Sequence, residues 1–495
     1  MMPAISQQRI SAVFRRHTED GRSVIMNTCL MHPFASLQRF HLDVSLYSVA
    51  DTGCHHETDE TVGVSRCVLM ETSPALRKGI VVEVKRVDSD VMGHAVQPHK
   101  LHIYKFKCIN IMPTFVSSHR IVVMTSLFAP LTLGDLTLRN RIALPPLTRC
   151  RSEQPGNVPG TMMVDYYRQR ASAGFMVTEG TQIEPRGQGY AWTPGIHSEA
   201  QIAGWRNVTD AVHAEGGTLF CQLWHVGRVS HNELQPGKQP PVAPSAVAAS
   251  GVRVFIETGP GAGVLTDPSL PRALTTSEVK EIVAMYRTAA ENAKRAGFDG
   301  VELHAANGYL INQFISEHTN FRTDEYGGSL DNRLRFLREI IEAVSSVFGS
   351  HRVGVRFAPL FSSTEEERVY LGLVESDPHA TYLRAAEMLN ALETGYLSIA
   401  EADWDNSPEL PERFRIALRE TFRSPIMYSG RYTKEKAERM LEKGWGDLFG
   451  FGRTFIANPD LPTRFKMGYP LNEVDAGSLY GGSEKGYTDY PFYPA

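Results

Sequence analysis

The sequence lacks several features that would point to particular classes of protein. Its 495 residues contain no apolar run long enough to cross a bilayer. They also contain no extended stripe of lysine and arginine of the kind that binds nucleic acid. The formal net charge is only -4 at pH 7. We therefore expect neither a membrane partner nor a nucleic-acid partner.

Cysteine is scarce, at six residues in the whole chain, and no Cys-x-x-Cys pair is present. This spacing gives neither a disulfide framework nor a zinc ribbon, so we expect no metal and a reducing compartment, the cytoplasm. Arg9, Arg15 and Arg16 precede the first acidic residue, which is faintly similar to a mitochondrial presequence. A Gly-x-Gly-x-x-Gly motif is also missing, so no Rossmann dinucleotide domain is expected.

Residues 1–123 differ from the rest of the chain. They carry 14 Lys and Arg against 11 Asp and Glu, and they show no sustained periodicity or repeat. We expect a poorly ordered N-terminal extension, followed by one domain at 124–495, with Met124 as the functional start. Cys54, His55, His56 and Cys67 raise the alternative of a metal site, but their spacing fits no common ligand pattern.

From Leu127 onward, short apolar segments alternate with amphipathic ones, as in folds that alternate strands and helices. Ser198 is expected to cap one helix, and Thr275 with Glu278 forms a capping box for another. Residues 231–270, rich in Pro, Gly and Ser, are expected to be a long loop over the functional face. The expected strands, the last two with their loops, are 141–144, 175–178, 218–224, 301–303, 352–359, 396–400, 425–433 and 448–459.

A group of candidate catalytic residues directly follows the fourth of these strands. His304 and Asn307 can donate hydrogen bonds to a developing oxyanion, and Tyr309 can hand over a proton. In a parallel α/β barrel, the chemistry lies at this end of the strands. The spacing leaves an alternative open, in which His304 and Asn307 cap the next helix and Tyr309 packs on it.

Two polar residues lie inside apolar strands and therefore need partners. Gln222 is either a satisfied structural amide or a ligand contact, since an unpaired core amide is costly. Arg356 needs an anion, which could be a barrel carboxylate such as Glu302 or a bound ligand. His225 could be read as a zinc ligand, but nothing nearby in the sequence supplies the other ligands.

The loops after the seventh and eighth strands have the composition of a phosphate site. Ser429, Gly430 and Gly452 allow close approach of the backbone, and Arg453 offers a bidentate charge. Barrels commonly bind phosphate at these two loops. The acidic residues after the sixth strand, Glu401, Asp403 and Asp405, are expected to be solvated rather than catalytic.

Several motifs resemble those of the Old Yellow Enzyme family of flavin-dependent ene-reductases. The longest runs from His304-Ala-Ala-Asn-Gly-Tyr309 to Asn320-x-Arg-Thr-Asp-Glu-Tyr-Gly-Gly-Ser329. Pro145 to Arg149, Gln222 to Arg228, and Phe451 to Pro459 resemble further family motifs. The resemblance covers residues 127–495. It implies a (β/α)8 TIM barrel whose bottom is plugged by a β-hairpin lid at 128–138.

The resemblance also implies a reaction. FMN would take hydride from NADPH or NADH and pass it to the β-carbon of an α,β-unsaturated carbonyl. His304 and Asn307 would hold the carbonyl oxygen, and Tyr309 would protonate the α-carbon. The expected partner is a small molecule, whether an enone, an oxylipin, a quinone or a nitro compound. The protein is expected to be a monomer or a homodimer.

By the same resemblance, Gln222 would meet the flavin pyrimidine edge and Arg356 the N1 region. Pro145 replaces the alanine of the family motif and Tyr428 replaces a small residue, and we expect both departures to be tolerated. The substrate pocket would be lined by Trp224, Tyr190 and Tyr480. The complete set of cofactor contacts would be Pro146, Leu147, Thr148, Gln222, Arg356, Ser429, Gly430, Gly452 and Arg453.

Two other hypotheses come from different classes of protein. One is a phosphate-binding aldolase or isomerase on the same barrel, which needs a strand-end lysine or paired carboxylates, and none is well placed. The other is a non-enzymatic scaffold whose N-terminal extension binds a partner.

Overall fold

The computed structural model describes residues 126–360, 375–401 and 409–494 and, before residue 126, only the backbone of six strands. The chain divides into two units, Met1–Met124 and Thr125–Ala495. The first unit holds two antiparallel sheets: β1 (Arg9–Ile10), β2 (Cys29–His32) and β3 (His41–Val44), and β4 (Val64–Leu69), β5 (Ile80–Val87) and β6 (Ile103–Asn110). The expected disorder of residues 1–123 and the candidate metal group at Cys54 to His56 lie outside the described residues.

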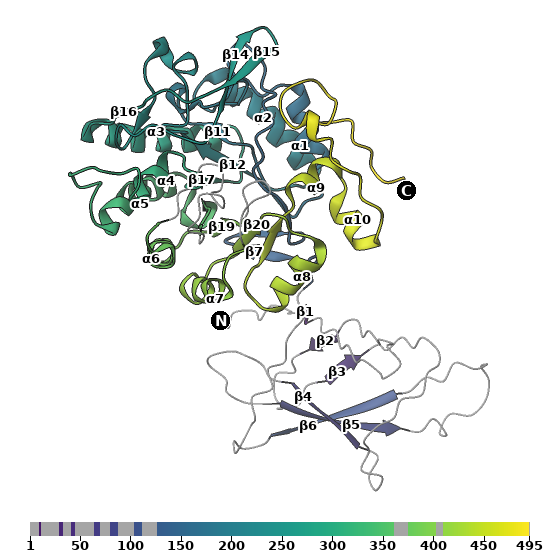
Figure 1. Cartoon of the computed structure of the whole chain (residues 1–495). Coiled ribbons are helices and arrows are strands. Elements are labelled where there is room, and N and C mark those ends of the chain that lie inside the picture. Colours follow the sequence, from purple (N-terminus) through teal and green to yellow (C-terminus); the bar gives the residue numbers. More distant parts are fainter. Residues whose placement is uncertain are drawn as a thin grey trace, which may run out of the picture. The chain divides into compact units, whose positions relative to one another are not determined.

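In the second unit, eight parallel strands form a closed barrel (Figure 1). Each strand pairs with the next one along the chain, and the last pairs back with the first. The predicted fold class is therefore confirmed. The strands are β9 (Ile142–Leu144), β10 (Phe175–Val177), β12 (Leu219–Trp224), β17 (Gly300–His304), β18 (Val353–Phe357), β19 (Tyr396–Ala400), β20 (Ile426–Ser429) and β21 (Leu448–Gly450).

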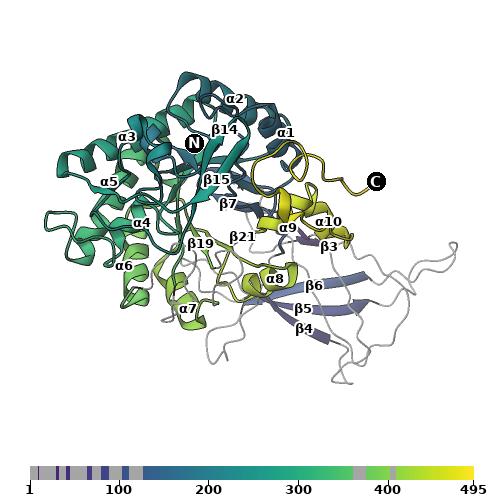
Figure 2. The same cartoon turned by 45° about the horizontal axis from the view of Figure 1, so that its top comes forward.

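Amphipathic helices surround the strands of this unit (Figures 1 and 2). The helix that precedes β17 shows why they form where they do. Thr275 and Glu278 make the predicted capping box, which is worth about 1 kcal/mol, and Val279, Ile282 and Tyr286 are fully buried on one face. The outer helices are α1 (Thr161–Gln169), α2 (Glu199–Ala214), α3 (Thr276–Arg295), α5 (Leu330–Phe348), α6 (Pro378–Ala391), α7 (Glu412–Thr421) and α8 (Lys434–Glu442). Among the described residues, none of the helices has the length and apolarity that a membrane span requires.

The predicted hairpin lid is formed by β7 (Leu131–Leu133) and β8 (Leu136–Leu138). Gly134, with φ of 58°, makes the tight turn between them. Leu133 and Leu138 are fully buried in a cluster with residues from the first or second position of the barrel strands, such as Phe175 and Phe220. The hairpin therefore closes the N-terminal end of the barrel, and each buried leucine stabilises that closure by about 2 kcal/mol.

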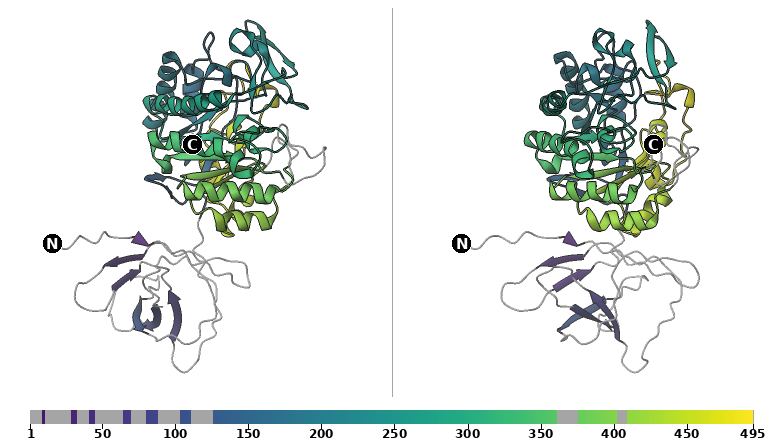
Figure 3. Two further views of the ribbon diagram at one scale, coloured as in Figure 1. Left: turned by 90° about the vertical axis from the view of Figure 1, so that its left-hand side faces the viewer. Right: turned by 60° about the vertical axis from the view of Figure 1, so that its left-hand side comes forward.

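The segment 231–270 differs from the prediction of a loop. It contains a β-hairpin made of β14 (Val254–Gly259) and β15 (Ala262–Thr266), which projects beyond the neighbouring helices (Figures 1 and 3). The glycine-rich run Gly259 to Gly263 is its turn, where Gly261 has φ of 69°. Its strands have glycine and charged residues among their few apolar ones, so the alternation that marks a strand is weak in the sequence.

Glu401 also differs from the prediction, because it is buried rather than solvated. Only 3% of it is exposed, and it forms an ion pair with Arg415 and accepts a hydrogen bond from Tyr432. Asp403 and Asp405 lie outside the described residues. A short apolar strand followed by several acids looks solvated in the sequence, because the buried arginine that pairs with one of them comes from a distant helix.

Candidate active site

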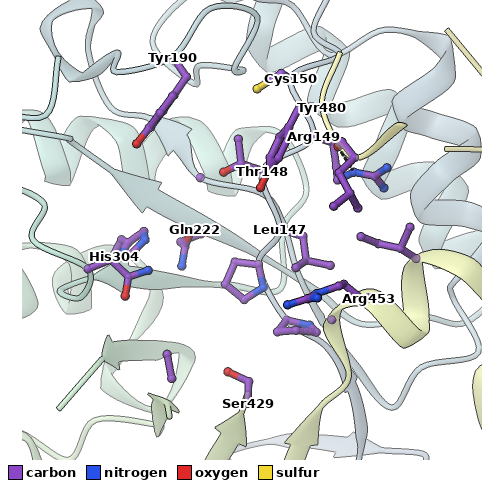
Figure 4. Close-up of a pocket in the computed structure, with 18 of the residues that line it drawn as sticks. Leu147, Thr148, Arg149, Cys150, Tyr190, Gln222, His304, Ser429, Arg453 and Tyr480 are labelled. Carbon is purple, nitrogen blue, oxygen red and sulfur yellow. Dashed lines mark hydrogen bonds between the residues drawn. The ribbon is translucent and has the colours of Figure 1, made fainter. Parts of the chain in front are cut away.

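A cavity of about 860 Å³ opens at the C-terminal ends of the barrel strands (Figure 4). In Figure 4, His304 lies at one side and Arg453 at the other, with Gln222 and Leu147 between them. Its lining includes every site residue expected from the sequence: Pro146, Leu147, Thr148, Tyr190, Gln222, Trp224, His304, Asn307, Tyr309, Arg356, Ser429, Gly430, Gly452, Arg453 and Tyr480. The structure thus gathers the predicted residues in one place, whatever role each has.

The candidate catalytic trio is carried by the end of β17 and the turn that follows it. His304 is the last residue of the strand, and Asn307 lies in the turn with φ of 56°. Tyr309 is the N-cap residue of α4 (Leu310–Ile315), and it makes no side-chain cap hydrogen bond. Because the cap position belongs to Tyr309, the alternative that His304 and Asn307 cap the next helix is wrong.

Two polar atoms of this trio are buried without a hydrogen-bond partner among the described residues. They are the Nδ1 atom of His304 and the Oδ1 atom of Asn307. A buried polar atom without a partner costs roughly 1–3 kcal/mol, so a folded protein rarely leaves two of them side by side without a use. This pair therefore indicates a polar ligand in the cavity.

His304 is uncharged near neutral pH. Its pKa lies well below the usual 6.5 because the ring is buried and because the guanidinium of Arg356 is nearby. A neutral imidazole donates from only one nitrogen, so His304 can polarise a ligand oxygen without bringing in a positive charge.

Aromatic rings form one wall of the cavity. The ring of Trp224 lies nearly parallel to that of Tyr190, with 6.0 Å between centroids, and edge-on to that of Tyr309 at 5.0 Å. The hydroxyl oxygens of Tyr190 and Tyr309 are 3.4 Å apart. Gly180 faces the Trp224 ring, where an added Cβ would lie 2.5 Å from a ring carbon, so this wall requires glycine at that position. The result is a flat, mainly apolar space with hydroxyls at one edge.

The floor of the cavity is polar and is connected by hydrogen bonds. Gln222 donates from Nε2 to Glu302 at 2.8 Å. Arg356 donates from Nη1 to Ser398 at 3.1 Å and to Ser429 at 3.2 Å. The two readings of Gln222 and Arg356 are therefore compatible, because each has a structural partner and also lines the cavity.

The rim formed by the last two strands has little side-chain bulk. Ser429 ends β20 and pairs with Gly450 at the end of β21. Gly430 follows with φ of 122°, a conformation that favours glycine. Gly452 begins the short helix α9 (Gly452–Ala457), and Arg453 follows it. This rim combines exposed backbone with a guanidinium, which is the chemistry that an oxyanion such as a phosphate needs.

Other residues of the cavity had no clear signal in the sequence. Cys150, Trp192 and Arg431 line it with left-handed backbone, at φ of 54°, 60° and 51°. Such conformations are uncommon in residues other than glycine and cluster at functional sites, but they become visible only in a structure. Phe255 and Leu265 reach the cavity from the hairpin β14–β15, whose strands were not predicted.

The structure also bears on the alternative sites. His225 is fully buried and lies 3.3 Å from a carboxylate oxygen of Glu184, and the described residues include no group of three potential metal ligands. The part of the cavity lining that the structure describes holds neither a lysine nor a carboxylate. It therefore lacks the groups that an aldolase or isomerase of the phosphate-binding barrel type would need.

A barrel with a flat aromatic cavity, a neutral histidine–asparagine pair and a rim suited to a phosphate has the site architecture of a flavin-dependent oxidoreductase. Comparison with known proteins agrees. Residues 126–472 match the NADH:flavin oxidoreductase / NADH oxidase family. The chain belongs to this family, that of Old Yellow Enzyme.

The similarity to individual relatives is extensive. The chain is 41% identical over 384 residues to 12-oxophytodienoate reductase 7 of Oryza sativa subsp. japonica, covering 74% of this chain and 94% of the relative. It is 48% identical to the solved structure of morphinone reductase, with a TM-score of 0.72, covering 76% of this chain and 98% of that one. For the Old Yellow Enzyme homologue of Zymomonas mobilis, the identity is 40% and the TM-score 0.68, with coverages of 74% and 99%.

The protein is therefore an FMN-dependent oxidoreductase of the ene-reductase type. It uses reduced nicotinamide as its electron source and reduces activated alkenes. Both the family and the reaction agree with the expectation from the sequence.

Proposed function

We propose that FMN is held across the cavity by the residues that the sequence motifs single out. Gln222 and Arg356 would hold the polar edge of the ring, and Ser429, Gly430, Gly452 and Arg453 the phosphate. Pro146, Leu147 and Thr148 would hold the ring from the loop after β9. The volume of about 860 Å³ is within the usual range for cofactor sites, and the two glycines leave room for close backbone contact with a phosphate.

The proposed chemistry of the chain concerns the other side of the cavity. When bound and reduced, FMN supplies the hydride that adds to the β-carbon of the alkene. His304 and Asn307 donate hydrogen bonds to the substrate oxygen and stabilise the enolate charge that develops there. Donors of this kind are each worth about 3–4 kcal/mol in comparable oxyanion sites. Tyr309 then donates its hydroxyl proton to the α-carbon, which completes the reduction.

The substrate class follows from the shape of the cavity. Rings of Trp224, Tyr190 and Tyr309 favour a flat apolar body, and the histidine–asparagine pair favours one activating oxygen. We propose a small enone, oxylipin, quinone or nitro compound. The relatives are named for 12-oxophytodienoate and morphinone. The cytoplasm as the compartment, and a monomer or homodimer, stay predictions.

One observation carries the proposed roles. The unpartnered atoms of His304 and Asn307 lie in the same cavity as Tyr309, Gln222 and Arg453. Oxygen-binding donors, a proton donor and a cofactor-binding rim are thus in reach of one bound pair of molecules.

Separate measurement of the two half-reactions tests the role of Tyr309. We expect Tyr309→Phe to slow alkene reduction by about 100-fold or more, the usual worth of a general acid, while NADPH reduces the bound FMN at nearly the wild-type rate. Stopped-flow absorbance of the flavin measures both steps.

Tyr190→Phe is the matched variant, because it removes the hydroxyl beside that of Tyr309 and leaves the proposed proton donor in place. Its rate of alkene reduction should stay far above that of Tyr309→Phe. Equal losses in both half-reactions of Tyr309→Phe would exclude Tyr309 as the proton donor.

A further inference from the structure

Glu302 lies directly beneath the cavity and is the centre of its polar floor. It stands on β17, two residues before His304, and is fully buried. One of its carboxylate oxygens accepts from Gln222 Nε2 at 2.8 Å, and the other accepts from the Tyr396 hydroxyl at 2.9 Å. Two donors on two oxygens are the pattern of an ionised carboxylate.

The charge of Glu302 has a partner in Arg356. Burial raises the pKa of Glu302, and the positive charge of Arg356 and hydrogen bonds from Tyr396 and Gln222 oppose that rise. Arg356 is itself buried and donates to Ser398 and Ser429. One hydrogen-bonded and charged network therefore joins Glu302 to three of the residues that line the cavity: Gln222, Arg356 and Ser429.

The hydrogen bond to Glu302 also fixes the direction of the Gln222 amide. Because the carboxylate can only accept, the NH2 group of Gln222 must point toward it, and the amide oxygen is left for the cavity. Gln222 and Glu302 are direct neighbours on the paired strands β12 and β17, which holds this geometry.

We propose that Glu302 is a positioning residue that presents the oxygen of Gln222 to the cofactor and balances the charge of Arg356, and thereby lowers the midpoint potential of bound FMN. The proposal rests on the proposed function, in which Gln222 and Arg356 contact FMN. Two-electron reduction adds negative charge to the flavin ring, so a carboxylate beneath the ring disfavours the reduced form and an uncompensated guanidinium favours it.

Redox titration of the Glu302→Gln holoenzyme tests the charge. The side chain keeps its shape and loses its charge, so reduced FMN should bind at least tenfold more tightly relative to oxidised FMN than in the wild type. For a two-electron couple, this ratio corresponds to a rise of about 30 mV in the midpoint potential.

Glu401→Gln is the matched control, since Glu401 is also buried, is paired with Arg415, and does not line the cavity. Its FMN potential should equal that of the wild type. A Glu302→Gln holoenzyme with the wild-type potential, or an equal shift in Glu401→Gln, would overturn the proposal.

Glu302→Asp tests the orientation and serves also if Glu302→Gln does not fold. Aspartate keeps the charge but is one methylene shorter, so it withdraws from the Gln222 amide. Oxidised FMN, measured by fluorescence quenching, should bind at least tenfold more weakly. Wild-type affinity in this variant would refute the positioning role.

Gln222→Leu and Arg356→Met separate the two ways to fail. Each should weaken FMN binding if these residues contact the cofactor. If both bind FMN as the wild type does, the assigned cofactor contacts are wrong. If both weaken it while the Glu302 variants do not, only the role of Glu302 is wrong.

Discussion

At the residue scale, a second buried carboxyl group has a protonation state that its surroundings control. Glu179 follows β10 and is fully buried, with Oε2 accepting from the backbone N–H of Arg149 at 3.2 Å. Burial raises the pKa of Glu179 to about 7, although the hydrogen bond and charge of Arg149 and the charge of Arg151 act in the opposite direction. The folded protein therefore keeps a proton on Glu179 at a pH where the unfolded chain has lost it.

This shift gives a stability prediction with a definite sign. Between pH 4.5 and 7 the folded state binds more protons at Glu179 than the unfolded state, so its contribution to stability falls as pH rises. Glu179→Gln has no charge to bury, and at pH 8 it should be more stable than the wild type by up to roughly 3 kcal/mol. Urea unfolding at pH 5 and pH 8 measures this.

The advantage of Glu179→Gln should shrink toward pH 5, where the wild-type carboxyl is protonated. A wild type that gains stability over the variant as pH rises would contradict the shifted pKa.

Residues of the site differ in how far the sequence could predict them. His304, Asn307 and Tyr309 were predictable because polar groups stand directly after a buried strand. The burial of Glu179 and the left-handed backbone of Cys150 and Trp192 were not, because both depend on segments that the chain brings together only on folding.

At the scale of elements, the C-terminal tail forms a wall of the cavity that two arginines hold in place. Arg149 donates to the carbonyls of Leu479 and Gly486, both at 2.8 Å. Arg151 donates to backbone carbonyls of Ser478, Ser483 and Lys485. Tyr480 lines the cavity from the segment so fastened, which we name the tail wall, residues 478–487.

We expect Arg151→Gln to loosen the tail wall without removing a cofactor contact. Arg151 does not line the cavity, so FMN binding should persist, while the KM for the alkene should rise by about tenfold, equivalent to about 1.4 kcal/mol. Faster hydrogen exchange in residues 478–487 should accompany the change in KM.

Arg464→Gln is the matched control for Arg151→Gln. Arg464 is also buried and also binds tail carbonyls, those of Pro470 and Pro491, which lie outside the tail wall. It should affect stability and leave the KM unchanged. The same rise in KM in both variants would show a general loss of stability instead of a specific wall.

Elements with a strong periodicity were predictable, and those without one were not. The face of α3 is marked by Val279, Ile282 and Tyr286, and its start by Thr275. The hairpin β14–β15 was missed because its strands are short and rich in glycine and charge. The tail wall has no periodicity, and its order comes from the arginine side chains.

At the scale of the whole molecule, the unit Thr125–Ala495 has what it needs to fold by itself. It contains a closed barrel, a hairpin that seals one end, and a large buried core. The barrel class came from the resemblance of motifs, because strand and helix patterns alone do not tell a closed barrel from an open parallel sheet.

We therefore expect a protein that begins at Met124 to be folded and to bind FMN. Its thermal unfolding and its rate of alkene reduction should match those of the full chain, because the cavity residues all lie after that point. An insoluble or inactive product would show that residues 1–123 are needed.

The most direct measurement is a crystal structure of the FMN-loaded protein with a bound phenol, whose oxygen mimics that of the substrate. We expect the phosphate at Arg453 and Gly430, the polar edge of the ring at Gln222 and Arg356, and the phenol oxygen within hydrogen-bond distance of His304 and Asn307. FMN bound elsewhere, or a phenol oxygen that contacts neither residue, would contradict the account.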